Sequence, residues 1–311
     1  MDLQFISAMK KYEPCPGWYC GRQLLENHEL SDCGSCPRGY RRNETTFICM
    51  PCTDSLTFYD WLYLGFIVIF LLILHWFFID MVSMRRSFSK PGLILHLTAT
   101  FEVIISSILS LLIVHPFGSL EIKSCAVRSM ADWYTLLHNP NPYYTETVHC
   151  TQEAVYPMYS IVCLFYALNL ACMLLLRPWV CKKISLSRST MSIYAAMYYL
   201  PILGVSHALI GGLLYYAFPY LIVVMSVISC AAHFAFTINQ TVFSLITTTL
   251  YSPRNVIILL GHWCLHAYGI IAITEFVEPL FHSLLILLVP FPTLFYILTA
   301  RFTNPKKFDK S

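Results

Sequence analysis

The amino-acid sequence predicts an all-α polytopic membrane protein with a small disulfide-rich head at its N-terminus. Three observations support this fold class. Of the 311 residues, 57% are hydrophobic and only 12% are charged, whereas an ordinary soluble domain carries about 25% charged residues. About seven apolar runs approach the ~20 residues that a membrane-spanning helix needs. The chain has 13 cysteines, and six of them lie in the short stretch before the first of these runs.

Each apolar run must be helical, because hydrocarbon offers no partner for backbone N–H and C=O groups. Pro201, Pro290 and Pro292 lie inside such runs and are expected to kink them. A short Gly-Gly/Tyr-Tyr segment joins the fourth and fifth runs, so six spanning helices remain an alternative to seven. The runs are Trp61–Met81, Leu93–Val114, Ala154–Leu176, Ile193–Gly212, Ala217–Ile238, Val256–Thr274 and Leu280–Ala300.

The predicted domain organisation follows from these runs. A cysteine-rich lumenal head occupies residues 1–58, a seven-helix transmembrane domain residues 59–300, and a short basic tail residues 301–311. The loop 115–153 is expected on the same lumenal side as the head. The loops expected on the cytosolic side are 82–92, 177–192 and 239–255.

Lys and Arg residues near helix ends predict the orientation, because cytosolic loops of membrane proteins carry an excess of both. With a lumenal N-terminus, the lumenal loops hold only Lys123 and Arg128. No cleavable signal peptide is visible, so the first run is expected to act as a retained anchor. The basic residues then expected on the cytosolic side are Arg85, Arg86, Lys90, Arg177, Lys182, Lys183, Arg188, Arg254, Arg301, Lys306, Lys307 and Lys310.

The head is too short and too polar to build an adequate core alone, so it needs cross-links. In an oxidising lumen its six cysteines would form three disulfides, whose pairing the sequence leaves open. In the cytosol, two Cys-x-x-Cys pairs would instead predict a zinc site. The predicted topology favours disulfides, and Asn43 opens a glycosylation sequon that is usable only in the lumen. The cysteines of the head are Cys15, Cys20, Cys33, Cys36, Cys49 and Cys52.

Two further cysteines, Cys125 and Cys150, lie in the loop 115–153. Because two helices tether the ends of this loop, a disulfide between them is expected, with two free thiols as the alternative. The disulfide candidates therefore number eight, six in the head and two in the loop.

Ionisable residues inside membrane spans are costly and are functional candidates by default. His262 and His266 lie four apart, on one helix face. Together with His96, and with Glu102 activating a bound water, they would make an intramembrane zinc hydrolase. No third histidine stands at motif spacing, so ordinary interhelical hydrogen bonding is favoured. A seven-helix receptor is the other alternative, although its usual helix-end motifs are absent. We predict no enzyme, catalytic residue, metal or cofactor.

A cytosolic segment after the third run is the candidate docking site for a kinase. Lys182 and Lys183 are basic, and Ile184 and Leu186 would point to one side of an extended strand. Basic residues followed by alternating apolar residues are typical of peptides that fill a groove beside an acidic patch. Positive-inside anchoring, with the two apolar side chains dipping into the membrane interface, explains the same pattern and is favoured.

The chain as a whole resembles the Jun-kinase-associated membrane protein (JAMP) family. The resemblance rests on long strings rich in Trp, Tyr and His that follow the family's order over nearly the whole chain. These strings are Tyr59–Phe66, Leu74–Asp80, Asp132–Tyr144, Thr147–Val162, Ser192–Leu203, Gly211–Tyr220, His262–Ile270 and Thr299–Pro305.

The resemblance implies an endoplasmic-reticulum membrane protein that is not an enzyme. It implies binding of a Jun-type stress kinase, and recruitment of proteasome subunits and ubiquitin ligases for the disposal of misfolded proteins during the unfolded protein response. The cytosolic loops, where such partners must dock, are among the segments that match the family least. The disposal role is therefore better supported by the resemblance than kinase binding.

Overall fold

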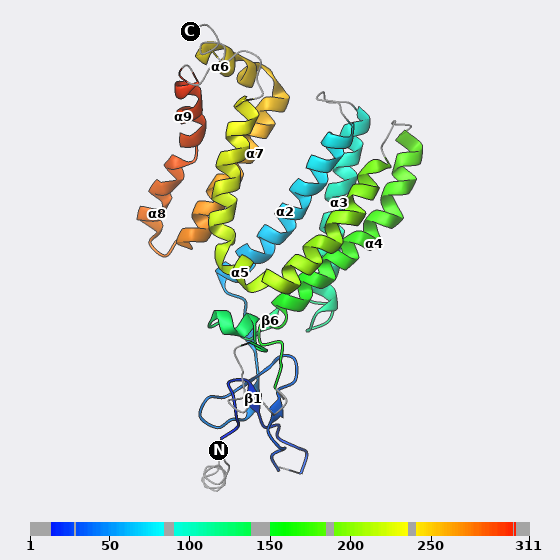
Figure 1. Ribbon diagram of the computed structural model, residues 1–311, viewed down its shortest axis with the longest axis vertical. Helices are drawn as coiled ribbons and strands as arrows, with labels where there is room; N and C mark the ends of the chain where they lie inside the picture. Colours follow the sequence, from blue (N-terminus) through cyan, green and yellow to red (C-terminus); the bar gives the residue numbers. More distant parts are fainter. Residues whose placement is uncertain are drawn as a thin grey trace. The chain divides into compact units, whose positions relative to one another are not determined.

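The computed structural model describes residues 14–27, 29–83, 90–137, 150–184, 190–235, 241–300 and 302. Its elements are a set of short strands near the N-terminus followed by long helices (Figure 1). The chain divides into two compact units, Met1–Leu214 and Tyr215–Ser311. The first unit contains the disulfide-rich head, and both contain helices apolar enough to cross a membrane.

The head is built from pairs of very short antiparallel strands. β1 (Cys20–Gly21) pairs with β2 (Gly34–Ser35), and β3 (Tyr40–Arg42) pairs with β4 (Cys49–Pro51). The third pair joins β5 (Asp54–Ser55) to β6 (Lys123–Ser124), which lies in the loop 115–153. This loop is therefore part of the same structure as the head. Such short strands bury little apolar surface, so the cross-links must supply much of the stability.

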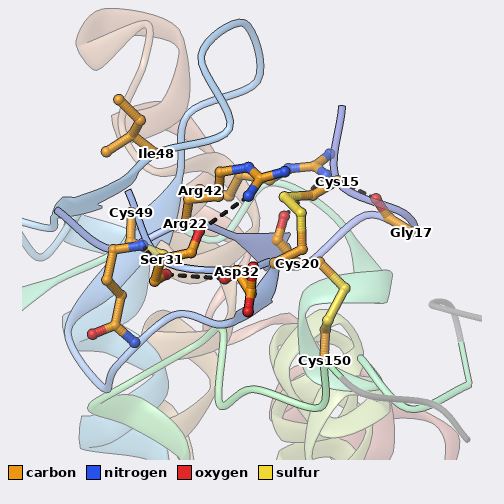
Figure 2. Close-up of a disulfide and its surroundings, with 12 residues drawn as sticks. Cys15, Gly17, Cys20, Arg22, Ser31, Asp32, Arg42, Ile48, Cys49 and Cys150 are labelled. Atoms are coloured by element: carbon orange, nitrogen blue, oxygen red, sulfur yellow. Dashed lines mark hydrogen bonds between the residues drawn. A yellow bond between two sulfur atoms is a disulfide. The ribbon is translucent and has the colours of Figure 1, made fainter. Parts of the chain in front are cut away.

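All eight candidate cysteines form disulfides. Two bonds lie within the head and two connect the head to the loop 115–153, and Figure 2 shows the cluster around Cys15, Cys20 and Cys150. Gly21 packs against one bridge so closely that an added Cβ would lie 2.7 Å from Cys36 Sγ. The four bonds are Cys15–Cys33, Cys20–Cys150, Cys36–Cys49 and Cys52–Cys125.

The predicted bridge between Cys125 and Cys150 is therefore wrong, as is the prediction of three bridges inside the head. The reason is the strand pairing of Asp54 with Ser124. It sets Cys52, just before β5, beside Cys125, just after β6. Because a disulfide requires close Cα atoms, the register of this strand pair selects the partner, and the sequence does not reveal that register.

Four helical segments complete the first unit. They are α2 (Phe58–Ser83), α3 (Lys90–Ile113), α4 (Met158–Ile184) and the first part of α5 (Met191–Ala235). Helix α3 packs against both α2 and α4 (Figure 1). A short 3-10 helix, η1 (Met130–Trp133), lies in the loop 115–153.

Helix α5 covers both the fourth and the fifth predicted runs. Its 45 residues would extend about 67 Å at ~1.5 Å per residue, more than twice the ~30 Å thickness of the hydrocarbon core. The backbone leaves helical geometry at Ile210, with φ −124° and ψ 18°, and not at Pro201 as the sequence predicted. The described residues hold six helices long and apolar enough to span a membrane. About seven spans are consistent with this count if α5 contributes two.

In the second unit, the last predicted run is interrupted where prolines occur. It comprises α8 (Pro279–Leu285), η2 (Ile286–Leu288) and α9 (Phe291–Thr299). Pro290 and Pro292 flank the start of α9, as predicted from the loss of a backbone donor at proline. Helix α7 (Pro253–Thr274) precedes this segment. The core of the unit gathers Cys230, Phe234, Leu245, Ile297 and Ala300.

The predicted loop 239–255 contains a short apolar helix, α6 (Val242–Tyr251). Thr241 caps its first turn by accepting a hydrogen bond from the Ser244 N–H at 3.3 Å. At the other end, the Asn255 side chain donates to the carbonyl of Thr248 at 3.0 Å. The sequence prediction missed α6 because ten residues are too few to register as a membrane span.

We predict that Cys150→Ser will leave Cys20 unpaired and destabilise the head, because removing a disulfide from a small domain costs about 2–5 kcal/mol. Peptide mapping under non-reducing conditions should recover the 20–150 and 52–125 linkages from the wild type. Steady-state protein should fall for Cys150→Ser and stay unchanged for Cys264→Ser, which replaces a free exposed cysteine. Recovery of a 125–150 linked peptide would contradict the structure.

Candidate functional site

A cluster of buried polar side chains lies among the four helices of the first unit. It contains His75 from α2, Glu102 from α3, Asn169 and Arg177 from α4, and Tyr199 from α5. Glu102, Asn169 and Arg177 have no exposed surface, and His75 is 1% exposed. Ionisable groups inside membrane-spanning helices are rare and mark candidate functional sites.

The centre of the cluster is an ion pair between α3 and α4. Arg177 Nε donates to Glu102 Oε1 at 3.2 Å, and Arg177 Nη2 donates to Glu102 Oε2. This is the bidentate geometry in which a guanidinium matches a carboxylate best. Removing one partner of such a pair would leave an uncompensated charge in an apolar interior.

The prediction that a loop begins at Arg177 is wrong. Helix α4 continues to Ile184, so Arg177 lies inside the helix and is completely buried. The apolar run ends at Leu176, where a charge follows, so the sequence alone indicates a loop at Arg177. The linear order of residues does not reveal that Glu102 neutralises this charge.

His75 extends the cluster to α2. Its Nδ1 receives a hydrogen bond from Arg177 Nη2 at 3.2 Å and contacts the Tyr199 hydroxyl, while its Nε2 lies 2.9 Å from Asn169 Oδ1. A guanidinium is only a donor, so Nδ1 must accept and Nε2–H must donate. His75 is therefore the neutral Nε2–H tautomer, and side chains from α4 and α5 contact it.

Two donors of the cluster, Arg177 Nη1 and Asn169 Nδ2, have no hydrogen-bond partner within the described residues. Both carboxylate oxygens of Glu102, by contrast, face Arg177. A carboxylate held in this way is a poor general base, because accepting a proton would break the ion pair. The chemistry of the cluster therefore suits holding helices together better than it suits hydrolysis.

Each residue of the hypothetical zinc hydrolase has another partner within its own unit. His96 Nε2 lies 3.3 Å from Asp80 Oδ1, and Glu102 is paired with Arg177. In the second unit, His262 and His266 contact the hydroxyls of Ser229 and Ser226 at 3.0 and 2.9 Å. Within the ranges that the structure describes, no three His, Cys, Asp or Glu side chains are grouped as metal ligands would be.

A second polar network joins the head to the loop 115–153 through Asp132 of η1. Arg41 Nη2 lies 2.9 Å from Asp132 Oδ2, and the backbone N–H of Arg128 donates to the same oxygen at 2.8 Å. The Tyr19 hydroxyl donates to Oδ1 at 3.4 Å. Burial, followed by the negative charge of Asp132, raises the pKa of Tyr19. Tyr19 therefore remains a neutral donor at physiological pH.

Trp133, the next residue, packs against the helices. Its ring lies edge-on to Tyr63 of α2, with centroids 6.0 Å apart, and to His207 of α5, with centroids 6.3 Å apart. Gly212 allows this approach, since a Cβ there would lie 2.6 Å from Trp133 Cβ. The string DWYTLLHNPNPYY, which contains both Asp132 and Trp133, is the sequence signal for this contact region.

Of the remaining predicted site residues, Asn43, Lys182 and Lys183 are exposed. Asn43 is exposed, and its Oδ1 accepts hydrogen bonds from the backbone N–H groups of Thr45 and Thr46 at 2.9 and 3.2 Å. Nothing in this geometry hides the sequon. Whether Asn43 is glycosylated stays a prediction.

The candidate docking residues Lys182 and Lys183 are exposed in the last turn of α4, and Ile184 ends the helix. Lys183 Nζ lies 4.2 Å from the centre of the Trp179 ring, one turn earlier. The predicted extended conformation is therefore wrong for Lys182, Lys183 and Ile184, which are helical. Leu186 lies outside the described residues.

Comparison with known proteins decides the family. A protein-family model described as "JNK1/MAPK8-associated membrane protein" matches residues 15–305. The mouse and human proteins of that name are each 48% identical to this chain over 302 residues, covering 94% of both sequences. The chain belongs to the JAMP family. A Caenorhabditis elegans homologue in this family is 31% identical over 303 residues, covering 92% of this chain and 93% of its own length.

No solved structure matches this JAMP-family chain. The matched range includes every cysteine of the head, η1 and the Glu102–Arg177 pair. The sequence prediction found the family and the cysteines of the head. The ion pair was not predicted. A signal for it was present, because Glu102 is an acid inside an apolar run and Arg177 is a base beside another.

We predict that Arg177→Met will destabilise the first unit by about 3–5 kcal/mol, because it leaves Glu102 charged and buried without a partner. The combined variant Glu102→Gln/Arg177→Met should be less destabilised than Arg177→Met alone. Thermal unfolding in detergent measures both effects.

The matched control is Asp80→Asn, which removes the partly exposed contact with His96 and should cost about 0–1 kcal/mol. If Arg177→Met unfolds at the same temperature as Asp80→Asn, the ion pair does not hold α3 against α4.

Proposed function

We propose that this JAMP-family protein is a non-enzymatic adaptor of the endoplasmic-reticulum membrane. In this role it associates with a Jun-type stress kinase and recruits proteasome subunits and ubiquitin ligases for the disposal of misfolded proteins. The observation that carries the proposal is the 48% identity, over 94% of both chains, to mouse and human proteins named for association with JNK1/MAPK8. The resemblance of the whole sequence to the family supports the disposal role.

The proposed orientation has the head in the lumen and the C-terminus in the cytosol. Four disulfides in the head and the loop 115–153 support this placement, because disulfides persist in oxidising compartments. Reassigning Arg177 to the interior removes one of the basic residues that predicted the orientation. Lys182 and Lys183 remain exposed at the end of α4, so the asymmetry of positive charge still favours this orientation.

The ion pair between Glu102 and Arg177 supports an adaptor over a hydrolase. Glu102 is the acid that the hydrolase hypothesis uses as a catalytic base, and it already has a structural role. The exposed end of α4 offers cytosolic partners two lysines on a helical turn. A docking peptide would therefore combine the end of the helix at Ile184 with an extended segment after it, and Ile184 and Leu186 would be its apolar anchors.

We predict that Asn43 carries a glycan, because its sequon is exposed and belongs to the side of the membrane on which the head is proposed to lie. Endoglycosidase should increase the gel mobility of the wild type and leave Asn43→Gln unchanged. The chain has another sequon, Asn239-Gln240-Thr241, in the loop 239–255 that is predicted to face the cytosol. The control is therefore Asn239→Gln, which should not alter mobility. Digestion of the head by protease added outside sealed microsomes would overturn the orientation.

We predict that Jun kinase and proteasome subunits will co-purify with the full-length protein from solubilised membranes, and that folding stress will increase proteasome capture. The variant Ile184→Ala/Leu186→Ala should reduce kinase capture several-fold without changing proteasome capture, because it removes apolar groove contacts and keeps the basic charges. Quantitative mass spectrometry of the captured proteins measures both.

The matched control is Ser185→Ala/Ser187→Ala, which alters the same segment and leaves its apolar residues in place. Equal kinase capture by Ile184→Ala/Leu186→Ala and the wild type would exclude this segment as the docking site. Failure to capture either partner with or without stress would overturn the adaptor proposal itself.

A further inference from the structure

The head contains a cavity that the proposed adaptor function does not use. Its volume is about 410 Å³, and it lies between the β1 and β3 region of the head and the residues around η1. This size falls at the lower end of the ~300–1,000 Å³ range that is typical of ligand sites. Its lining is polar and charged, with one tryptophan, Trp18, which is 64% exposed.

The walls of the cavity are held in place by covalent and polar links. The Cys20–Cys150 disulfide ties the strand beside Tyr19 to the segment that contains Gln152. Arg42 Nη1 donates to the carbonyls of Gly17 and Cys20 at 2.7 and 3.3 Å (Figure 2). A site whose walls are fixed in this way loses little conformational entropy when it binds a ligand.

The charges around the cavity do not balance. Three arginines and two acids line it, which leaves a surplus of one positive charge. Asp132 at the buried end is engaged by Arg41, Tyr19 and two backbone N–H groups. Glu44 pairs with Arg128 in an exposed salt bridge, with both side chains more than half exposed. The acids are therefore committed, and the surplus charge falls on Arg42.

Arg42 is partly buried, yet no carboxylate among the described residues forms an ion pair with it. Its hydrogen bonds go to two carbonyls, and its guanidinium lies 4.9 Å from the centre of the Phe47 ring. Burial lowers the pKa of Arg42, which reflects the cost of removing this cation from water. An anion that entered the cavity would compensate the charge and could form charge-assisted hydrogen bonds with it.

We propose that this cavity binds a polypeptide segment in which a carboxylate stands next to an aromatic or aliphatic side chain. The carboxylate contacts Arg42, and the neighbouring side chain packs on the exposed ring of Trp18, because tryptophan offers a large apolar face at binding sites. An uncharged glycan could pack on the Trp18 ring but would leave the charge of Arg42 uncompensated. This ligand site lies in the head and is separate from kinase docking at the end of α4.

The test uses the full-length protein in nanodiscs and two fluorescent peptides, measured by anisotropy. The acidic peptide alternates Asp or Glu with Phe or Trp, and the matched peptide replaces each acid by its amide. We expect the acidic peptide to bind at least tenfold more tightly, and added salt to weaken its binding. Trp18→Ala, a change at an exposed position, should weaken binding several-fold. Arg42→Gln should weaken it at least tenfold.

The control is Arg38→Gln, which removes the same charge from a head arginine that does not line the cavity and should bind as the wild type does. Non-reducing peptide mapping verifies that each variant keeps its four disulfides. If Arg42→Gln has lost them, its weaker binding reflects misfolding, and the affinity of Trp18→Ala alone tests the proposal. The proposal would be overturned if both peptides bound with equal affinity. It would also be overturned if Arg38→Gln weakened binding as much as Trp18→Ala does, or if neutral oligosaccharides displaced the acidic peptide.

Discussion

The ion pair between Glu102 and Arg177 is the interaction on which the first unit depends. Both side chains are fully buried, and an unpaired charge in that position would cost several kcal/mol. Helices α3 and α4 therefore cannot separate without exposing two charges to an apolar environment. Arg177 also donates to His75 of α2, and His75 contacts Tyr199 of α5. One guanidinium thus fixes the mutual position of four helices, a specificity that packing of uniformly apolar faces alone would not provide.

The 3-10 helix η1 connects these helices to the head. Two consecutive residues have different partners, since Asp132 binds Arg41 and Tyr19 of the head, whereas Trp133 packs on Tyr63 and on Gly212 of the helices. The disulfides Cys20–Cys150 and Cys52–Cys125 connect the same loop to the head covalently. The head is therefore no independent module on a flexible stalk, and changes in the first unit's helices have a physical route to the cavity beside Asp132.

Several features were predictable because they depend on local sequence. The apolar runs locate most of the helices, since hydrocarbon forces any such run to be helical. Pro290 and Pro292 correctly locate the interruption before α9. The buried cluster was less predictable, because Arg177 at the end of an apolar run looks like a loop residue until Glu102, 75 positions away, is seen beside it. Helix α6 was not predicted, because its ten residues are too few for a membrane span.

The sequence by itself determined the family, the helical membrane class, and which cysteines form disulfides, because these follow from composition, run length and residue strings. Only the tertiary structure decided the cysteine pairing, the partner of Arg177 and the charge surplus at Arg42. Each of these depends on contacts between residues far apart in the chain. Strand register sets which sulfur atoms meet, and helix packing sets which charges are neutralised. Neither can be read from a linear order of residues, because many pairings are compatible with the same local preferences.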